Sequence, residues 1–184
     1  TGGGQFRYRV DVGGWTTVST AASSTAAAFV EITGLDGASH ALTVEIVSAG
    51  TNGVILVGAE FLKSGSGAVL HKVGNGGAKG YDFLAMDATI WQAQVEALSP
   101  DLAIIMLGTN DSNAIEYPRT WVTHLTDLIG RIRAVRPLCD VLLIFSADNG
   151  LVESGTTPVL MQAFEGAMRR VAHEQGAGFL SFYM

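Results

Sequence analysis

Apolar and polar residues alternate with a period of two along the first third of the chain. The run Gln5–Val12 alternates, and Trp15–Ser19 follows a Gly13-Gly14 pair that is typical of a tight hairpin. Further strand-like runs cover residues 27–33, 39–47 and 54–62. Short strands at this spacing predict an antiparallel, jelly-roll-like β-sandwich over residues 1–64.

The pattern changes after the serine- and glycine-rich stretch at residues 63–67, and short apolar runs then alternate with helical patterns. The runs predicted as strands are residues 68–73, 102–107, 141–145 and 179–182. The predicted helices begin after Asp87, at Pro118 and at Thr157-Pro158. Strand–helix alternation with these loop lengths predicts an α/β domain over residues 65–184, with a parallel sheet and right-handed crossovers.

Composition narrows the class of protein. The chain has 184 residues, of which 48% are hydrophobic, so it can bury a core. Its net charge of −6 and its lack of like-charge runs argue against nucleic acid as the main partner. No apolar run reaches eighteen residues, so no membrane span is expected. The single cysteine, Cys139, cannot form an internal disulfide and is expected in the core.

Two glycine-containing turns hold the residues that are candidates for an active site. Residues 75–80 read Asn-Gly-Gly-Ala-Lys-Gly and follow one strand-like run, and residues 108–111 read Gly-Thr-Asn-Asp and follow another. Open α/β sheets bind ligands at the carboxyl ends of their strands. We therefore expect both turns to converge on one crevice. The first turn also fails as a dinucleotide fingerprint, because Lys79 stands where the last glycine is needed, which disfavours a nucleotide-binding domain.

These two turns resemble the second and third blocks of the SGNH (GDSL-like) hydrolases, and the resemblance covers about residues 67–184. It implies a flavodoxin-like, three-layer α/β/α fold, here partial, and the cleavage of esters, often acetyl groups on carbohydrates. By match, Gly80 supplies a backbone N–H and Asn110 a side-chain amide to the oxyanion hole. Both groups can donate to a developing oxyanion without a change of protonation.

Each of these residues could also have a structural role instead of a catalytic one. Asn110 could be a turn amide that caps local backbone, Gly80 could serve only to allow a positive φ, and Asp111 is expected to cap and orient the loop. The residues that could line the substrate cleft are Lys79, Thr109, Asn113 and Asp148, although solvated loop positions and a turn-forming role would explain them too.

Two blocks of the SGNH pattern are missing from this sequence. There is no Gly-Asp-Ser, and none of the four histidines has an aspartate three residues before it. The resemblance then implies that the nucleophilic serine lies before Thr1 and the histidine base after Met184, in a longer protein. The alternative is a protein that has lost its catalytic triad. This chain alone is not expected to hydrolyse esters.

The first 64 residues resemble a carbohydrate-binding-module-like sandwich, in Gly-Gly-Gly-x-Phe and in the stretch from Val10 to Thr20. Peptidoglycan O-acetylesterases and some phage-tail relatives carry such an insertion. Trp15 and Tyr8 would then stack on sugar or fill the core.

The sequence therefore predicts an O-acetylesterase that acts on an acylated carbohydrate and needs no metal or cofactor. We expect the protein to be extracytoplasmic or virion-associated. It could act alone, in a homo-oligomer or in a larger assembly. The alternative is a non-catalytic binding or structural module of a phage tail or surface assembly.

Overall fold

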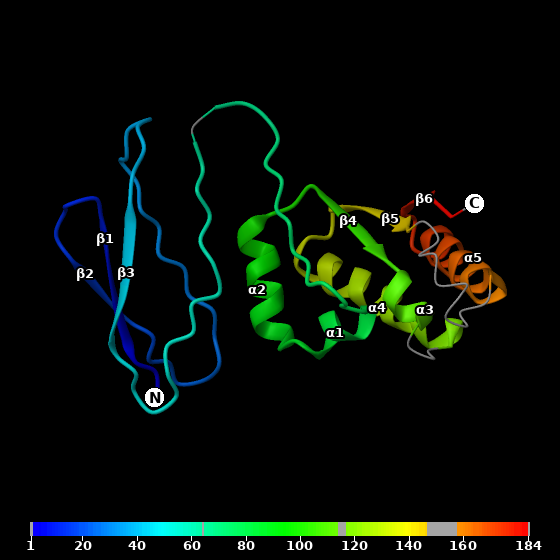
Figure 1. Ribbon diagram of the computed structural model, residues 1–184, viewed down its shortest axis with the longest axis horizontal. Helices are drawn as coiled ribbons and strands as arrows, with labels where there is room; N and C mark the ends of the chain where they lie inside the picture. Colours follow the sequence, from blue (N-terminus) through cyan, green and yellow to red (C-terminus); the bar gives the residue numbers. More distant parts are fainter. Residues whose placement is uncertain (1, 64, 114–116, 147–157, 184) are drawn as a thin grey trace. The chain divides into compact units, whose positions relative to one another are not determined.

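A computed structural model describes residues 2–63, 65–113, 117–146 and 158–183 of the chain (Figure 1). The chain forms two compact units, Thr1–His71 and Lys72–Met184, whereas the sequence predicts a boundary after residue 64. Each unit has a three-stranded sheet of its own. The first sheet is antiparallel and the second is parallel, so the predicted change from β to α/β organisation is confirmed.

The sheet of the first unit consists of β1 (Gln5–Val10), β2 (Thr16–Ser19) and β3 (Leu42–Ser48), in the order β2-β1-β3. The predicted hairpin is confirmed by the antiparallel pairing of β1 with β2, and Asp11 takes a positive φ of 52° where the chain leaves β1. Among the described residues of this unit we find this one sheet and no second sheet packed on it.

The predicted strands at residues 27–33 and 54–62 are wrong, because neither segment pairs with another strand in the structure. Their apolar side chains remain exposed, as at Phe29 and Ile55. An apolar pattern shows that a segment could bury one face, but a strand also needs a partner for its backbone hydrogen bonds. These segments lack that partner.

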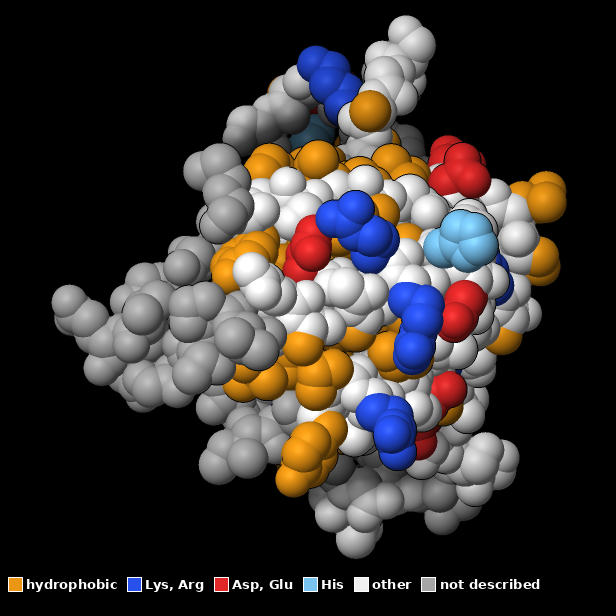
Figure 2. All heavy atoms as spheres, turned by 90° about the vertical axis from the view of Figure 1, so that its right-hand side faces the viewer, with side chains coloured by type: hydrophobic (Ala, Val, Ile, Leu, Met, Phe, Trp, Pro, Cys, Tyr) orange, Lys and Arg blue, Asp and Glu red, His pale blue; other side chains and the backbone are white. Residues whose placement is uncertain are grey.

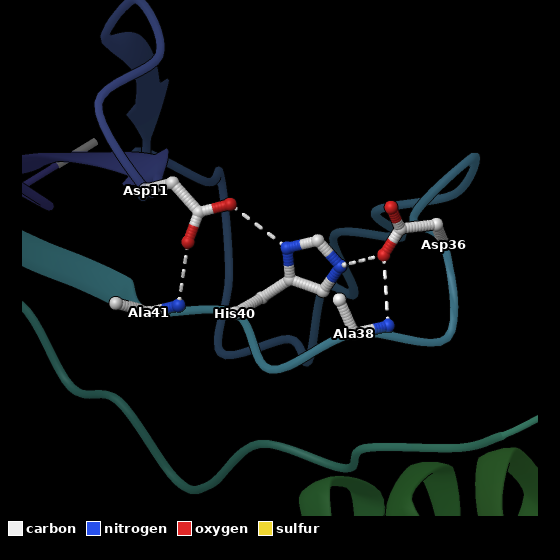
Figure 3. Close-up of polar contacts among 5 residues, drawn as sticks. All are labelled: Asp11, Asp36, Ala38, His40 and Ala41. Atoms are coloured by element: carbon white, nitrogen blue, oxygen red, sulfur yellow. Dashed lines mark hydrogen bonds and ion pairs between the residues drawn. The ribbon is translucent and has the colours of Figure 1, made fainter.

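A histidine bridges two loops of the first unit. Nδ1 of His40 lies 2.8 Å from a carboxylate oxygen of Asp11, and Nε2 lies 3.1 Å from Asp36 (Figure 3). Backbone N–H groups of Ala38 and Ala41 also donate to these two carboxylates. The hydrogen bond that the His40 ring donates to Asp11 raises the pKa of His40, and the same bond lowers the pKa of Asp11. The bridge ties the end of β1 to the loop before β3.

Trp15 carries cationic neighbours. The guanidinium carbons of Arg7 and Arg9 lie 4.2 and 4.6 Å from the centroid of the Trp15 ring. Arg7 also forms a cross-strand ion pair of 2.6 Å with Glu45. These cation–π contacts explain why Trp15 is held against β1.

The parallel sheet of the second unit consists of β4 (Leu102–Leu107), β5 (Asp140–Phe145) and β6 (Gly178–Ser181), in that order. These elements confirm the strands predicted at 102–107, 141–145 and 179–182. The strand predicted at residues 68–73 is wrong, because this stretch has no ladder partner and its apolar side chains are exposed.

The helices are α1 (Gly80–Ala85), α2 (Ala88–Leu98), α3 (Thr109–Asn113), α4 (Pro118–Val135) and α5 (Pro158–Glu174). The predicted starts of α2 and α4 are confirmed. Asp87 caps α2 by accepting a hydrogen bond of 3.0 Å from the backbone N–H of Ile90. Pro118 occupies the first turn of α4, where its missing N–H costs no helical hydrogen bond.

The core of the second unit lies on one side of its sheet. Figure 1 shows the strands along one side of this unit and the helices along the other. Leu143 and Phe145 of β5 are buried against Trp121 of α4 and Phe164 of α5, and the Trp121 ring centroid lies 5.1 Å from that of Phe164. Cys139 is buried beside this core, as predicted, and its burial raises the pKa of its thiol.

Charged side chains of both signs are mixed on the face shown in Figure 2, between patches of apolar side chains. On α5, Arg169 pairs with Glu165 at 2.6 Å and Arg170 with Glu174 at 3.6 Å, each one helical turn apart. None of the helices in the described part of the chain is both long and apolar enough to cross a membrane.

Candidate functional site

A cavity of about 240 Å³ opens at the carboxyl ends of β4 and β5. The glycine-rich turn before α1 forms one wall, and the end of β4 with the start of α3 forms the other. Its lining residues are Val73, Gly74, Asn75, Gly76, Gly77, Ala78, Phe83, Met106, Leu107, Gly108, Thr109, Asn110 and Ser146. The two turns therefore meet at one crevice, as expected from the position of ligand sites in open α/β sheets.

Asn110 lies in this cavity, in the first turn of α3. Its Nδ2 atom donates a hydrogen bond of 3.1 Å to the backbone carbonyl of Ala78. A carboxamide nitrogen carries two N–H groups, so this bond orients the amide and leaves a second donor. The predicted oxyanion donor is thus half-buried, held by the opposite wall and next to the cavity.

Asp111 joins the two turns. Its Oδ1 accepts a hydrogen bond of 2.7 Å from the N–H of Gly80, and its Oδ2 accepts one of 3.2 Å from the N–H of Gly108. The side chain is fully buried. Burial raises the pKa of the Asp111 carboxyl, and the two backbone donors partly oppose that rise. Asp111 therefore orients the loop, the role expected of it, by satisfying two buried N–H groups.

Gly80 differs from its expected arrangement. The backbone N–H of Gly80 donates its hydrogen bond to Asp111. Gly80 is buried, and it is not among the residues that line the cavity. A role in the oxyanion hole stays a prediction for Gly80, and it requires this N–H to exchange its partner. The alternative that Gly80 serves a positive φ is wrong, because its φ is not positive. Glycine is favoured by space, since a Cβ atom here would lie 3.3 Å from Oδ1 of Asp111.

Thr109 lines the cavity, and its hydroxyl group contacts the hydroxyl of Ser146. Ser146 was not singled out from the sequence. The available signal was its position, because it is the first polar residue after the buried strand β5, at the same sheet edge as Thr109. The two hydroxyls add polar groups to the wall that also carries the Asn110 amide.

Of the other predicted cleft residues, Lys79 is not among those that line the cavity. The Lys79 side chain points to the Tyr81 ring, with Nζ 5.3 Å from its centroid, and the Lys79 N–H donates to Asp82 at 2.8 Å. The backbone of Asn113 ends α3, but its side chain lies outside the described part of the structure, and so does Asp148.

Acid–base groups are scarce around the cavity. None of the described residues that line it is a histidine, aspartate, glutamate or lysine. Within the residues that the structure describes, no group of three or more His, Cys, Asp or Glu side chains could hold a metal ion. The described part of the lining therefore offers hydrogen-bond donors and hydroxyls, and it holds no base that could activate a nucleophile.

A family profile and a solved structure each match part of this chain. The sequence profile of the family described as GDSL-like Lipase/Acylhydrolase matches residues 56–184, more than half of the chain. No curated protein sequence matches the chain. Among solved structures, the chain is similar to a protein from Parabacteroides merdae that is assigned as a GDSL-like lipase, with a TM-score of 0.47 and 19% identity. That match covers 58% of this chain and 51% of the other, so the chain spans about half of that protein's length.

Proposed function

This chain belongs to the GDSL-like lipase/acylhydrolase family, and on that premise we propose that it supplies the oxyanion-binding part of an ester hydrolase. The observation that carries the proposal is the Asn110 amide. It lies at the cavity wall, oriented by the Ala78 carbonyl, with a second N–H for a ligand. An amide fixed before the reaction stabilises negative charge without reorganisation.

The proposed reaction is acyl transfer to a serine followed by hydrolysis. A serine hydroxyl attacks the acyl carbonyl while a histidine accepts its proton, and the histidine then protonates the leaving alcohol. The Asn110 N–H donates to the oxyanion of the tetrahedral intermediate. We assign the serine and the histidine to polypeptide outside these 184 residues, because the sequence holds no Gly-Asp-Ser and no aspartate three residues before a histidine, and none of the described residues that line the cavity supplies a base.

The dimensions of the cavity favour a small acyl group. Gly76, Gly77 and Ala78 line it with little or no side chain, yet its volume is only about 240 Å³. An acetyl group fits such a space, whereas a long acyl chain needs a longer apolar channel. With the resemblance of residues 1–64 to a carbohydrate-binding module, this supports an O-acetylesterase that acts on an acylated polysaccharide. An extracytoplasmic or virion-associated location is part of the same proposal.

The test uses the full-length gene product that contains this chain, and it measures p-nitrophenyl acetate hydrolysis and acetate release from an O-acetylated polysaccharide. We expect Asn110→Ala to lower kcat by about 100-fold or more, with a smaller change in KM. The matched control is Asn75→Ala, which removes another amide that lines the same cavity. If Asn110→Ala and Asn75→Ala behave alike, the oxyanion assignment is wrong.

A second candidate is a non-catalytic module of a phage tail or surface assembly. The lack of acid–base side chains among the described residues that line the cavity favours it. A folded full-length protein that hydrolyses neither substrate, but binds the polysaccharide with an affinity that Asn110→Ala weakens, would support this candidate against the esterase.

A further inference from the structure

The antiparallel sheet of the first unit has two chemically different faces. Its register pairs Arg7 of β1 with Thr17 of β2 and Glu45 of β3, and it pairs Arg9 with Thr43. Cross-strand partners point to the same side of a sheet, so these side chains share one polar face. The ion pair between Arg7 and Glu45 agrees with this arrangement. The opposite face is largely apolar and includes Phe6, Tyr8, Val10, Val18, Val44 and Ile46.

Trp15 belongs to the polar face, because its ring contacts both arginines. The guanidinium carbons of Arg7 and Arg9 lie 4.2 and 4.6 Å from the ring centroid. Tyr8 lies on the opposite face, so the two aromatic side chains do not form one platform. The Trp15 ring holds both guanidinium groups in place, which lowers the entropy that they lose when a ligand binds.

The two arginines differ in their anionic partners. Nε and Nη2 of Arg7 donate to Oε2 of Glu45 at 3.0 and 2.6 Å, so a carboxylate of the protein balances its charge. No carboxylate among the described residues pairs with Arg9, and its Nε is closed off from solvent without a hydrogen-bond acceptor. A partly desolvated cation attracts an anion more strongly than one in water. Arg9 is thus the cation of this face that has room for an external anion.

A carboxylate on a sugar chain fits the surroundings of Arg9. The planar guanidinium recognises carboxylates through paired, charge-assisted hydrogen bonds. The hydroxyls of Thr17 and Thr43 and the amide of Gln5 lie on the same face and can bond sugar hydroxyls. β1 is paired on both sides, so a peptide cannot add as a strand next to the arginines, and the apolar side chains that would anchor a peptide lie on the other face.

We propose that the Arg9 face, formed by Arg7, Arg9, Trp15, Thr17 and Thr43, binds an acidic polysaccharide, and that Arg9 contacts the carboxylate of a uronic acid. The choice of a polysaccharide rests on the proposed function, and the Arg9 face narrows that substrate class to chains with negative charge. The protein has a net charge of −6 and would repel such a chain elsewhere on its surface. A cationic face therefore determines where the chain binds.

The experiment measures binding to the full-length gene product by isothermal titration calorimetry, at physiological ionic strength so that long-range attraction is screened. The probes are polygalacturonate, alginate and hyaluronan, each beside its neutral, carboxyl-reduced form. We expect an acidic polymer to bind at least about tenfold more tightly than its reduced form, and Arg9→Gln to weaken that binding at least about tenfold. The matched control, Lys63→Gln, removes an exposed positive charge from the same unit and should change the affinity less than about twofold.

Two further variants keep the test independent of a folding defect in Arg9→Gln. Arg9→Lys keeps the charge but loses the planar fork, so its affinity should fall between those of the wild type and Arg9→Gln. Binding should also change the fluorescence of Trp15. Trp15→Phe should remove that change, although Trp91 and Trp121 remain. Thermal unfolding identifies any variant that does not fold.

Equal weakening by Arg9→Gln and Lys63→Gln would overturn the proposal, because it would indicate unspecific attraction between charges. Equal affinity for the carboxyl-reduced forms would overturn it too, as would a failure to bind all three acidic polymers. If poly-L-glutamate binds as tightly and depends equally on Arg9, the partner is an acidic polypeptide and the polysaccharide is wrong. None of these readouts involves ester hydrolysis, so their failure is distinct from that of the proposed function.

Discussion

The backbone N–H of Gly80 donates to Oδ1 of Asp111 at 2.7 Å, across 31 positions of the sequence. This bond joins the start of α1 to the turn that follows β4. Asn110 adds its bond to the Ala78 carbonyl beside it. Two consecutive side chains thus hold the glycine-rich turn in place, and the shape of the cavity depends on both.

Replacing Asp111 by asparagine should destabilise the second unit. An asparagine has one acceptor oxygen, so one of the N–H groups of Gly80 and Gly108 would face an amide N–H₂ and lose its partner. We expect a loss of about 1–3 kcal/mol in the free energy of unfolding, measured by denaturant titration. The control is Asp127→Asn, an exposed position on α4, where we expect little change. Equal losses of stability in the two variants would contradict the two hydrogen bonds that Asp111 accepts from Gly80 and Gly108.

Gly108 and Gly130 should respond to alanine in opposite directions. Gly108 has a φ of +120°, and a Cβ atom there would lie 2.5 Å from the Phe145 ring, so Gly108→Ala should cost at least about 2 kcal/mol. Gly130 lies within α4 with no atom near its added Cβ, so Gly130→Ala should stabilise by about 0.5–1 kcal/mol. Thermal unfolding of both variants tests these two predictions. Stabilisation by Gly108→Ala would contradict the positive φ of Gly108 and its close approach to Phe145.

The bridge between His40 and Asp11 should make the first unit sensitive to pH. The pKa of His40 is raised above its ordinary value of 6.5, so its contribution to stability is complete below that value and is lost as pH rises through the raised pKa. The pKa of Asp11 is lowered below 3.8, so its contribution is present above that value and is lost as pH falls through the lowered pKa. Stability from this bridge should therefore be greatest between the two.

An NMR titration of the His40 ring tests this directly. Asp11→Asn should move the pKa of His40 down, because the hydrogen bond that Asp11 accepts from the His40 ring is the main cause of the rise. Asp36→Asn is the comparison and should have the smaller effect. If Asp11→Asn leaves the pKa of His40 unchanged, the hydrogen bond between His40 and Asp11 shown in Figure 3 is ruled out.

The N-terminal cap of α2 can be tested by two substitutions of Asp87, one that removes the hydrogen-bond acceptor and one that keeps it. Asp87→Ala removes the acceptor for the Ile90 N–H and should cost about 0.5–2 kcal/mol in the free energy of unfolding. Asp87→Asn keeps an acceptor oxygen and should restore most of that loss. If both variants lose the same stability, the charge of Asp87 rather than its hydrogen bond supports the helix.

Local patterns in the sequence were sufficient for most of the second unit from Asp87 onward, although the short helix α3 was not predicted. Apolar spacing, the Asp87 cap and Pro118 each act within a few residues, so the helices that they predict are found. The three buried runs from Leu102 onward are found as strands for the same reason, since each has a neighbouring run in the chain with which it can pair. The two glycine turns meet at one cavity as expected, although the run at residues 68–73 that precedes the first of them is not a strand.

Partners distant in sequence decided the rest. The runs at residues 27–33, 54–62 and 68–73 have strand-like patterns, but no strand pairs with them. The partner of the Gly80 N–H and the contact of Ser146 with Thr109 also depend on segments more than 30 residues apart. The sequence determined which segments could form strands and helices and which residues could be donors. Tertiary structure decided which of these groups met, because hydrogen bonds and burial require a partner that local patterns do not specify.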